Sequence, residues 1–253
     1  AEPPHRALLD WLAVELIEND WSMKHIHRLI ATSRTYRLSS SASRATDSAD
    51  WSDNEQRDAD NRLFWRANVR RLDAEVVRDS VLHVAGSLDR TLGGPDLDFS
   101  QGETVYRRSI YFRHAYEKQM TMLVLFDAAA PAECYQRSAS IVPQQALALA
   151  NSALTLDQAR LLAAKLSEKA LTDAHFIRRA YKSLLCRTCT ESELKVCRAF
   201  LVRQRALFVD TSQLTSLPGK SESRRQASEH PAQRARENLI HTLLNHNDFI
   251  TLR

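Results

Sequence analysis

Residues 61–90, NRLFWRANVRRLDAEVVRDSVLHVAGSLDR, form the stretch that decides the fold. Apolar side chains recur in it at intervals of three and four residues, the period of a helix that buries one face. Gly93, Gly94 and Pro95 follow, and both residue types oppose helix. The sequence therefore predicts one continuous helix over residues 61–90 that anchors the other helices. Its apolar positions are Leu63, Phe64, Ala67, Val69, Leu72, Val76, Val77, Val81, Val84, Ala85 and Leu88.

The same period, together with capping residues, predicts the remaining helices. Ser22 and Thr190 suit N-cap positions, and Glu193 would complete a capping box with Thr190. Pro143 suits the first turn of a helix, because the missing N–H is not needed there. The predicted helices cover residues 7–19, 23–37, 119–128, 143–150, 154–171, 173–185, 190–208 and 231–246. Polar connections are expected near residues 38–60 and 210–230.

One short segment favours β-structure. Residues 105–116 are rich in aromatic and β-branched side chains that alternate, so we expect a strand near residues 107–113, with residues 139–142 as one option for its partner. Only 5 glycines and 7 prolines disfavour an all-β fold. The predicted fold class is mainly α: a multi-helical single domain over residues 1–253 with a small two- or three-stranded β element.

The charge pattern limits the partners. The formal net charge is +4, with 28 arginines and 7 lysines against 31 acidic residues. Near balance favours internal ion pairs over a nucleic-acid surface, which usually concentrates positive charge on one face. No apolar run approaches the roughly 20 residues of a membrane span. The chain lacks a signal peptide and opens abruptly on AEPPH, which we interpret as the start of a fragment or a processed chain.

Cysteine and histidine spacing gives no clear metal or haem site. Cys186 and Cys189 have CxxC spacing, but Thr190 follows where c-type haem attachment needs His. With Cys197 they give three thiols, one short of a zinc site unless His175 or Cys134 supplies the fourth ligand. A local disulfide is an alternative, and free thiols packed in or beside a helix are favoured. We predict no cofactor and no metal.

His25 and His27 also invite a metal interpretation. Positions two apart on a helix diverge by about 200°, so both side chains cannot bind one ion from the same face. We expect one of them to face the core with a hydrogen bond and the other to be exposed.

The charged residues of the central stretch are the main candidate site. Asp73, Glu75 and Asp79 lie among arginines, and paired carboxylates can hydrolyse glycosides. Arg71/Glu75 and Arg70/Asp73 have helical pair spacing, which stabilises a helix by roughly 0.2–0.5 kcal/mol without any substrate. We therefore favour structural ion pairing. The candidate interaction residues are Arg66, Arg70, Arg71, Asp73, Glu75, Asp79, Arg107, Arg108, Arg113, Gln144, Gln145 and Asn151.

Their expected contacts differ. Arg66 follows Trp65, which favours a cation–π contact. The arginines at 107, 108 and 113 would meet an acidic partner or the acids of the central helix, and the amides at 144, 145 and 151 would tie loops to buried backbone or bind a ligand. No Gly-x-Ser-x-Gly, HExxH, phosphate-loop or EF-hand motif is present, so no catalytic residue is assigned.

Several long phrases carry a family resemblance. They are residues 5–40, the stretch 61–89, RRSIYFR (107–113), VPQQALALANSALTLDQA (142–159) and LLNHNDFI (243–250). The chain resembles the C-terminal domain of large planctomycete surface proteins, a domain of unknown function, over nearly its whole length. LLCRTCTESE stands where the family usually reads close to LGRPPTPEE, and ALANSA replaces the more usual ALLNSP. Cys186 and Cys189 thus occupy positions that look like Gly and Pro, which argues against a family metal site.

The resemblance implies a cellular location and a set of neighbouring domains, but no chemical activity. Such domains usually follow another uncharacterised domain and often a planctomycete-type cytochrome c domain. The resemblance therefore implies an envelope or exported location, with adjacent domains and a cytochrome c domain as partners. No catalytic residue can be assigned from it. The haem motif itself is missing from this chain.

The leading hypothesis is a non-enzymatic structural or interaction module of an envelope-associated multidomain protein. It would dock neighbouring domains, other partners or surface polysaccharide through an Arg-rich surface. The alternative is an enzyme or enzyme component acting on polysaccharide or in redox chemistry, and nucleic-acid binding is the second alternative. Convergence of Asp73, Glu75 and Asp79 with Arg107 and Arg108 in a water-filled cleft would favour a site, whereas paired and covered charges would favour structure.

Overall fold

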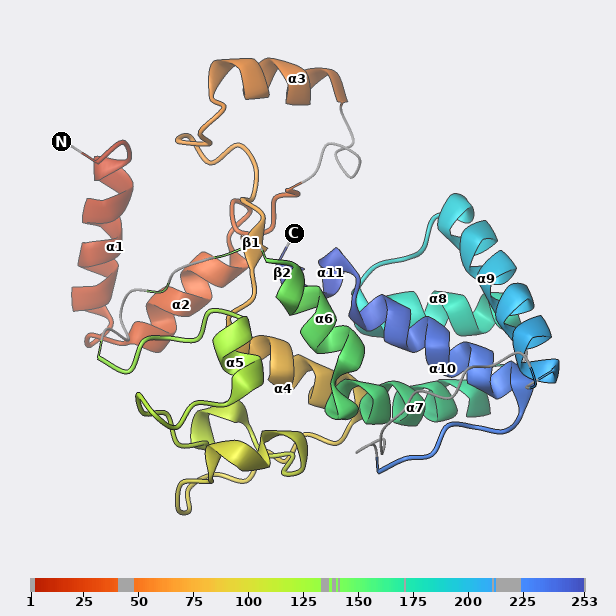
Figure 1. Ribbon diagram of the computed structural model, residues 1–253. Helices are drawn as coiled ribbons and strands as arrows, with labels where there is room; N and C mark the ends of the chain where they lie inside the picture. Colours follow the sequence, from red (N-terminus) through yellow and green to blue (C-terminus); the bar gives the residue numbers. More distant parts are fainter. Residues whose placement is uncertain are drawn as a thin grey trace. The chain divides into compact units, whose positions relative to one another are not determined.

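The computed structural model in Figure 1 is mainly helical, as predicted. It describes residues 3–40, 48–132, 137, 140, 142–170, 172–210, 212 and 224–252, with backbone alone for residues 48–51. The α-helices within these ranges are α1 (Arg6–Glu18), α2 (Met23–Thr32), α3 (Ser48–Arg57), α4 (Ala74–Ala85), α5 (Thr121–Leu125), α6 (Pro143–Asn151), α7 (Ala153–Glu168), α8 (Asp173–Leu184), α9 (Glu191–Val209), α10 (Pro231–Leu244) and α11 (Asn247–Ile250). Two 3-10 helices, η2 (Phe99–Glu103) and η3 (Ser109–Tyr111), and a two-stranded sheet of β1 (Arg70–Arg71) and β2 (Thr251–Leu252) complete the described elements.

The chain divides into two compact units. The N-terminal unit comprises Ala1–Arg70 with Thr251–Arg253, and the core unit comprises Arg71–Ile250. That the whole chain acts as a single domain stays a prediction.

In the core unit, α10 packs along both α7 and α9, while α4 packs on α7 and α5 (Figure 1). These helices bury apolar residues at helical spacing. On α10, for example, Leu239, Ile240, Leu243 and Leu244 are buried, and each contributes about 1.5–3 kcal/mol when fully removed from water. The same cluster includes Val77, Val81 and Leu82 of α4, so the middle of the stretch 61–90 is one part of the hydrophobic core and not its sole anchor.

The prediction of one continuous helix over residues 61–90 is wrong. Helix α4 covers only its middle, from Ala74 to Ala85, and ends at Gly86, which adopts the left-handed conformation of a C-cap. Before α4, Asn61 and Phe64 have positive φ angles of 55° and 56°. Leu63, expected on the buried face, is 67% exposed.

Side-chain hydrogen bonds explain why the helix does not start at residue 61. The Asp58 carboxylate accepts bonds from the backbone N–H groups of Arg62 and Leu63, at 2.8 and 2.7 Å. Asn61 donates to the carbonyl of Arg66 at 2.7 Å. Asp and Asn offer the backbone such alternatives to helical bonds, so turns form even though the apolar spacing is helical.

The predicted strand near residues 107–113 is also wrong. This segment forms η3, with isolated bridges that pair Arg107 with Asp89 and Phe112 with Leu97. The sheet lies instead at β1 and β2. The proposed partner strand, residues 139–142, falls partly outside the described residues.

Most helices predicted from caps are confirmed, with two differences. Ser22 caps α2, Pro143 begins α6, and Thr190 with Glu193 forms a capping box at the start of α9. Helix α2 ends at Thr32 instead of residue 37. The polar connection expected over residues 38–60 contains α3, which the sequence analysis missed.

The N-terminal unit has little core of its own. Every residue of α1 and α2 is described, and none of them is buried. His25 contacts the Glu15 carboxylate at 3.1 Å, which links the two helices, while His27 is exposed. The expected hydrogen bond of one histidine and the exposure of the other are confirmed, but His25 is half-buried against α1 and does not face a core.

Candidate functional site

Arg78 organises the loops around the candidate site. It lies on α4, its side chain has no exposed surface, and its guanidinium sits 4.8 Å from the centroid of the Phe112 ring. Its partners lie 24–31 positions further along the chain, so the sequence pattern could not identify its structural role. It donates hydrogen bonds to the carbonyls of Gly102, Val105 and Arg107, at 2.8, 2.7 and 2.9 Å, and to Ser109 Oγ at 3.2 Å.

This contact explains the irregular backbone of residues 99–112. A buried guanidinium needs several acceptors, and the carbonyls of these loops supply them. Carbonyls that turn inward cannot form a strand ladder. Burial lowers the pKa of Arg78, yet a guanidinium keeps its charge at any physiological pH.

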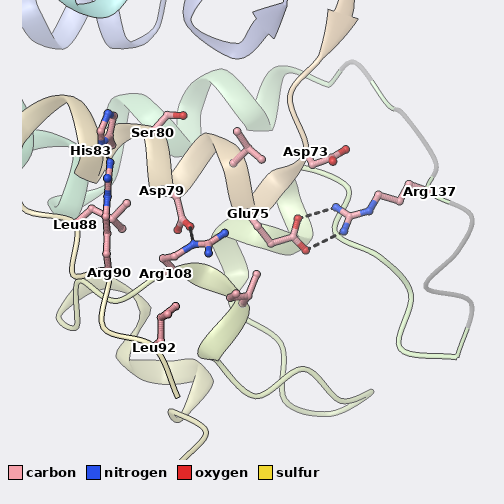
Figure 2. A pocket seen from close by; sticks show the side chains of 12 residues that line it. Asp73, Glu75, Asp79, Ser80, His83, Leu88, Arg90, Leu92, Arg108 and Arg137 are labelled. Atoms are coloured by element: carbon pink, nitrogen blue, oxygen red, sulfur yellow. Dashed lines mark hydrogen bonds and ion pairs between the residues drawn. The ribbon is translucent and has the colours of Figure 1, made fainter. Parts of the chain in front are cut away.

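A cleft of about 740 Å³ runs along the solvent-facing side of α4 (Figure 2). Acidic residues and a histidine of α4 face arginines of three other segments across it. The lining residues are Asp73, Glu75, Val76, Asp79, Ser80, His83, Leu88, Arg90, Leu92, Arg108, Ile110 and Arg137.

Two of the three carboxylates in the cleft, those of Glu75 and Asp79, are paired within the chain. Glu75 accepts two hydrogen bonds from the Arg137 guanidinium, at 2.6 and 3.2 Å (Figure 2). Asp79 accepts from the backbone N–H and the hydroxyl of Ser109, at 2.8 and 2.7 Å, and lies 3.7 Å from Arg108. Burial by itself would raise the pKa of Glu75. The bonds from Arg137, the backbone N–H of Glu75 and the charges of Arg137 and His114 together outweigh burial and leave this pKa below its ordinary value.

The third contact across the cleft involves a histidine. Arg90 Nη2 lies 2.8 Å from His83 Nδ1, so the arginine donates to this nitrogen when the imidazole is neutral. Between the charged contacts, the side chains of Val76, Leu92 and Ile110 are exposed. The cleft therefore has an apolar floor between internally paired charges.

The structure separates the predicted site residues into several groups. Asp73, Glu75, Asp79 and Arg108 line the cleft, but Arg107 does not. Its guanidinium stacks 4.0 Å from the centroid of Tyr111 and donates to the carbonyls of Thr91 and Gly93, at 2.9 and 2.5 Å.

The remaining candidates serve other surfaces. Arg113 pairs with Asp96 at 2.7 Å, outside the cleft. Gln144 and Asn151 are exposed on α6. The predicted helical pairs Arg71/Glu75 and Arg70/Asp73 are wrong, because both arginines belong to β1 and the helix begins only at Ala74.

Arg71 and Gln145 meet in a separate, partly buried network. Arg71 donates to the carbonyl of Ser140 and to Gln145 Oε1. Gln145 in turn contacts the carboxylate of Asp127 at 3.3 Å, and Ser140 donates to the same carboxylate at 2.8 Å. Gln145 also donates to the backbone carbonyl of Ser140 and accepts from the backbone N–H of Val142, both at 3.3 Å, so the predicted role of an amide that ties a loop to the backbone is confirmed for Gln145.

This geometry does not suit the two α4 carboxylates to acid catalysis. A general acid in glycoside hydrolysis needs a raised pKa so that it still carries a proton near neutral pH. The pKa of Glu75 is lowered instead, and Asp79 is held by a serine and an arginine. These contacts are the structural ion pairing favoured from the sequence, although with different partners.

A second concave surface lies within the N-terminal unit. It is a groove of about 710 Å³ with an apolar lining, and its only charged side chains among the described residues are Arg66 and Arg70. Both were candidate interaction residues. The groove is lined by Leu8, Trp11, Leu12, Leu29, Ile30, Ser33, Thr35, Tyr36, Leu38, Asn61, Phe64, Arg66, Ala67, Asn68, Arg70 and Leu252.

Arg66 is held in place at this groove. It donates to Asn68 Oδ1 at 2.9 Å and to the carbonyl of Ala59 at 3.1 Å. Its guanidinium lies 5.2 Å from the centroid of Trp65, which confirms the expected cation–π contact.

The cysteines do not assemble a site in the described part of the chain. Cys186, Cys189 and Cys197 are free thiols, and Cys134 lies outside the described residues. Burial raises the pKa of Cys197, whose sulfur lies 3.7 Å from the Tyr181 hydroxyl. Within the described ranges, no cluster of His, Cys, Asp and Glu could hold a metal ion, and no helix is long and apolar enough to cross a membrane.

Comparison with known proteins gives a family without a known activity. The chain matches no curated protein and no solved structure. Residues 1–201 match the family described as PSD1, protein of unknown function (DUF1553). That match covers residues 1–70 of the N-terminal unit, the α4 cleft and most of the helices of the core unit. The chain therefore belongs to the PSD1 family of proteins of unknown function (DUF1553).

Proposed function

We propose that this chain is a protein-interaction module that docks a partner through the groove of its N-terminal unit. The Arg-rich surface expected from the sequence is then the edge of this groove that carries Arg66 and Arg70. The observation that supports the proposal is the amount of apolar surface that α1 and α2 leave open to solvent.

The physical reason is the cost of exposed apolar area. Burying such surface is favourable by about 25 cal/mol per Å², and soluble proteins rarely expose large contiguous apolar patches unless these bind something. Trp11 is 47% exposed and Ile30 is 41% exposed, and both line the groove. Tyr36 is exposed beside them. Trp, Tyr and Arg are also the residue types that dominate binding energy at protein interfaces.

The proposal includes a cellular setting that rests on the family resemblance alone. The module would belong to an envelope or exported multidomain protein. Its partners would be neighbouring domains, including a cytochrome c domain where one is present. Surface polysaccharide is a weaker candidate for the groove, because an apolar lining with two arginines offers few acceptors to sugar hydroxyls.

A peptide-display experiment tests the proposal. The intact chain is immobilised and panned with a random 12-residue peptide library, and enriched peptides are measured against the chain and its variants. Ile30→Glu places a charge in the groove without removing a buried side chain. Val202→Glu is the matched control, because Val202 is 63% exposed on α9, outside the groove.

We expect peptides that bind the wild-type chain, lose at least tenfold in affinity to Ile30→Glu and keep their affinity for Val202→Glu. A difference of this size corresponds to about 1.4 kcal/mol of binding free energy. Failure to enrich any peptide, or enriched peptides that bind Ile30→Glu as tightly as wild type, would contradict the proposal. Circular dichroism of both variants checks that the helices persist.

A further inference from the structure

We infer that the occupant of the N-terminal groove is an amphipathic helix of a partner protein, with carboxylates on the flank that meets Arg66 and Arg70. This inference rests on the proposed function and names the chemistry of the partner. Two independent features of the groove support it, the shape left by α1 and α2 and the sign of the charge at its edge.

The shape favours a helix. Helices α1 and α2 are joined by only four residues, 19–22, and are linked by the contact between Glu15 and His25 at 3.1 Å. Leu12 and Leu29 are half-buried in the groove, whereas Leu8 and Ile30 remain exposed beside them.

A pair of amphipathic helices cannot enclose an apolar core by itself, because each helix covers only one side of the other. A third helix laid along the groove would complete such a core. It would insert side chains at positions i, i+3 or i+4, and i+7, which is the usual mode by which a helix binds an apolar groove.

The charge favours an acidic helix. Among the described lining residues the groove carries two arginines and no carboxylate. Arg66 is already oriented by Asn68 and Ala59, so a partner carboxylate would meet a guanidinium that loses little freedom on binding.

Arg70 is exposed, and its guanidinium has no hydrogen bond or ion pair with any residue that the structure describes. An Arg that is open to solvent beside an apolar lining can form a bidentate bond with a carboxylate at the edge of the interface. A basic helix would instead place like charges together, which penalises binding.

Two designed peptides test the inference. Both are 16 residues long and share one leucine face at helical spacing. One carries glutamates on the flanks of this face, and the other carries lysines at the same positions. Each is labelled with fluorescein, and its affinity for the intact chain is measured by fluorescence anisotropy in 0.05 and 0.5 M NaCl.

We expect the glutamate peptide to bind the wild-type chain about five- to tenfold more tightly than the lysine peptide at low salt, with a smaller ratio at high salt. Arg70→Glu should reverse this preference. Arg113→Glu makes the same charge change on an exposed side chain of the core unit and should preserve it. Ile30→Glu should weaken the binding of both peptides.

Failures of the two proposals give different results. If both peptides bind with equal affinity and Arg70→Glu has no effect, the inference about charge is overturned while groove binding survives. If neither peptide binds, or if Ile30→Glu has no effect, the proposed function fails as well. A third outcome would favour a lipid surface and overturn the inference. In it, neither peptide binds, the wild-type chain sediments with phosphatidylglycerol vesicles, and Ile30→Glu abolishes this sedimentation.

Discussion

Replacement of Arg78 by Met is the sharpest test of how the core unit is organised. Met approximates the volume of the arginine stem but cannot donate hydrogen bonds. The substitution leaves the carbonyls of Gly102, Val105 and Arg107 without their donor. Each unsatisfied buried carbonyl costs about 1–3 kcal/mol. Part of this cost is offset because a buried guanidinium no longer has to be desolvated.

Arg78→Met should therefore lower the free energy of unfolding by about 3–4 kcal/mol. This is near the lower end of the roughly 3–9 kcal/mol that three unsatisfied carbonyls would cost without that offset. The free energy of unfolding of most single domains is only about 5–15 kcal/mol, so this loss would be a large fraction of it. Arg78→Lys should fall between wild type and Arg78→Met, because an ammonium keeps the charge but cannot span all the acceptors.

Urea unfolding followed by far-ultraviolet circular dichroism measures the effect. All four tryptophans, at positions 11, 21, 51 and 65, lie in the N-terminal unit, so their fluorescence reports on that unit separately. Arg113→Met is the matched control, because its ion pair with Asp96 is about half exposed on both sides and should contribute less than about 1 kcal/mol. A loss below 1 kcal/mol for Arg78→Met, or an equal loss for Arg113→Met, would refute the reasoning.

Two further predictions concern the pH dependence and the backbone of the core unit. Bonds from Arg187 are the main cause that lowers the pKa of Glu193 from 4.5 to about 2. Its carboxylate should therefore add roughly 1–3 kcal/mol of stability above pH 4.5, lost as the pH falls from 4.5 towards 2. Urea unfolding between pH 2.5 and 7 should show this slope for wild type and a flatter one for Glu193→Gln, and equal slopes would contradict the assignment. Gly86 has a φ of 70°, and a Cβ there would lie 2.9 Å from Lys165 Nζ. Gly86→Ala should therefore cost about 1–2 kcal/mol, whereas a thermal midpoint equal to that of wild type would show that the C-cap is not strained by a side chain.

Local signals explain which parts of the fold could be predicted. The capping box depends only on Thr190 and Glu193, which are three residues apart in the sequence. Pro143 likewise indicates a helix start without reference to the rest of the chain. The helices of the core unit were therefore predicted with small errors at their ends. The class stayed correct although the continuous helix over 61–90 was wrong, because α7, α9 and α10 hold the core.

Competing side-chain hydrogen bonds, some local and some long-range, explain what could not be predicted. The apolar spacing before α4 is helical, but Asp58 and Asn61 bind backbone groups that a helix would need. The β-propensity of residues 105–116 was similarly overruled when Arg78 drew their carbonyls inward. The apolar period and the β-propensity of these segments do not show which side chains will compete for their backbone groups.

In the candidate site too, residues close in sequence could be predicted and distant partners could not. Glu75, Asp79 and Arg108 could be chosen because charged residues clustered in sequence on one stretch and one neighbouring segment. Arg137 could not, because it pairs with Glu75 from 62 positions away. The groove of the N-terminal unit was missed for another reason. The periods of α1 and α2 indicated buried faces, and only the structure reveals that these faces are open.

The two units differ in how their polar and apolar groups are satisfied, and this difference is the reason that we propose the groove, and not the cleft, as the binding surface. In the core unit the buried Arg78 has its acceptors, and the cleft carboxylates Glu75 and Asp79 have their donors, so a ligand there would have to break existing bonds. In the groove the apolar side chains and Arg70 would gain contacts without losing any. Binding free energy is the surplus of new interactions over those given up. The groove therefore offers more affinity per contact than the cleft, even though the cleft holds more charged residues.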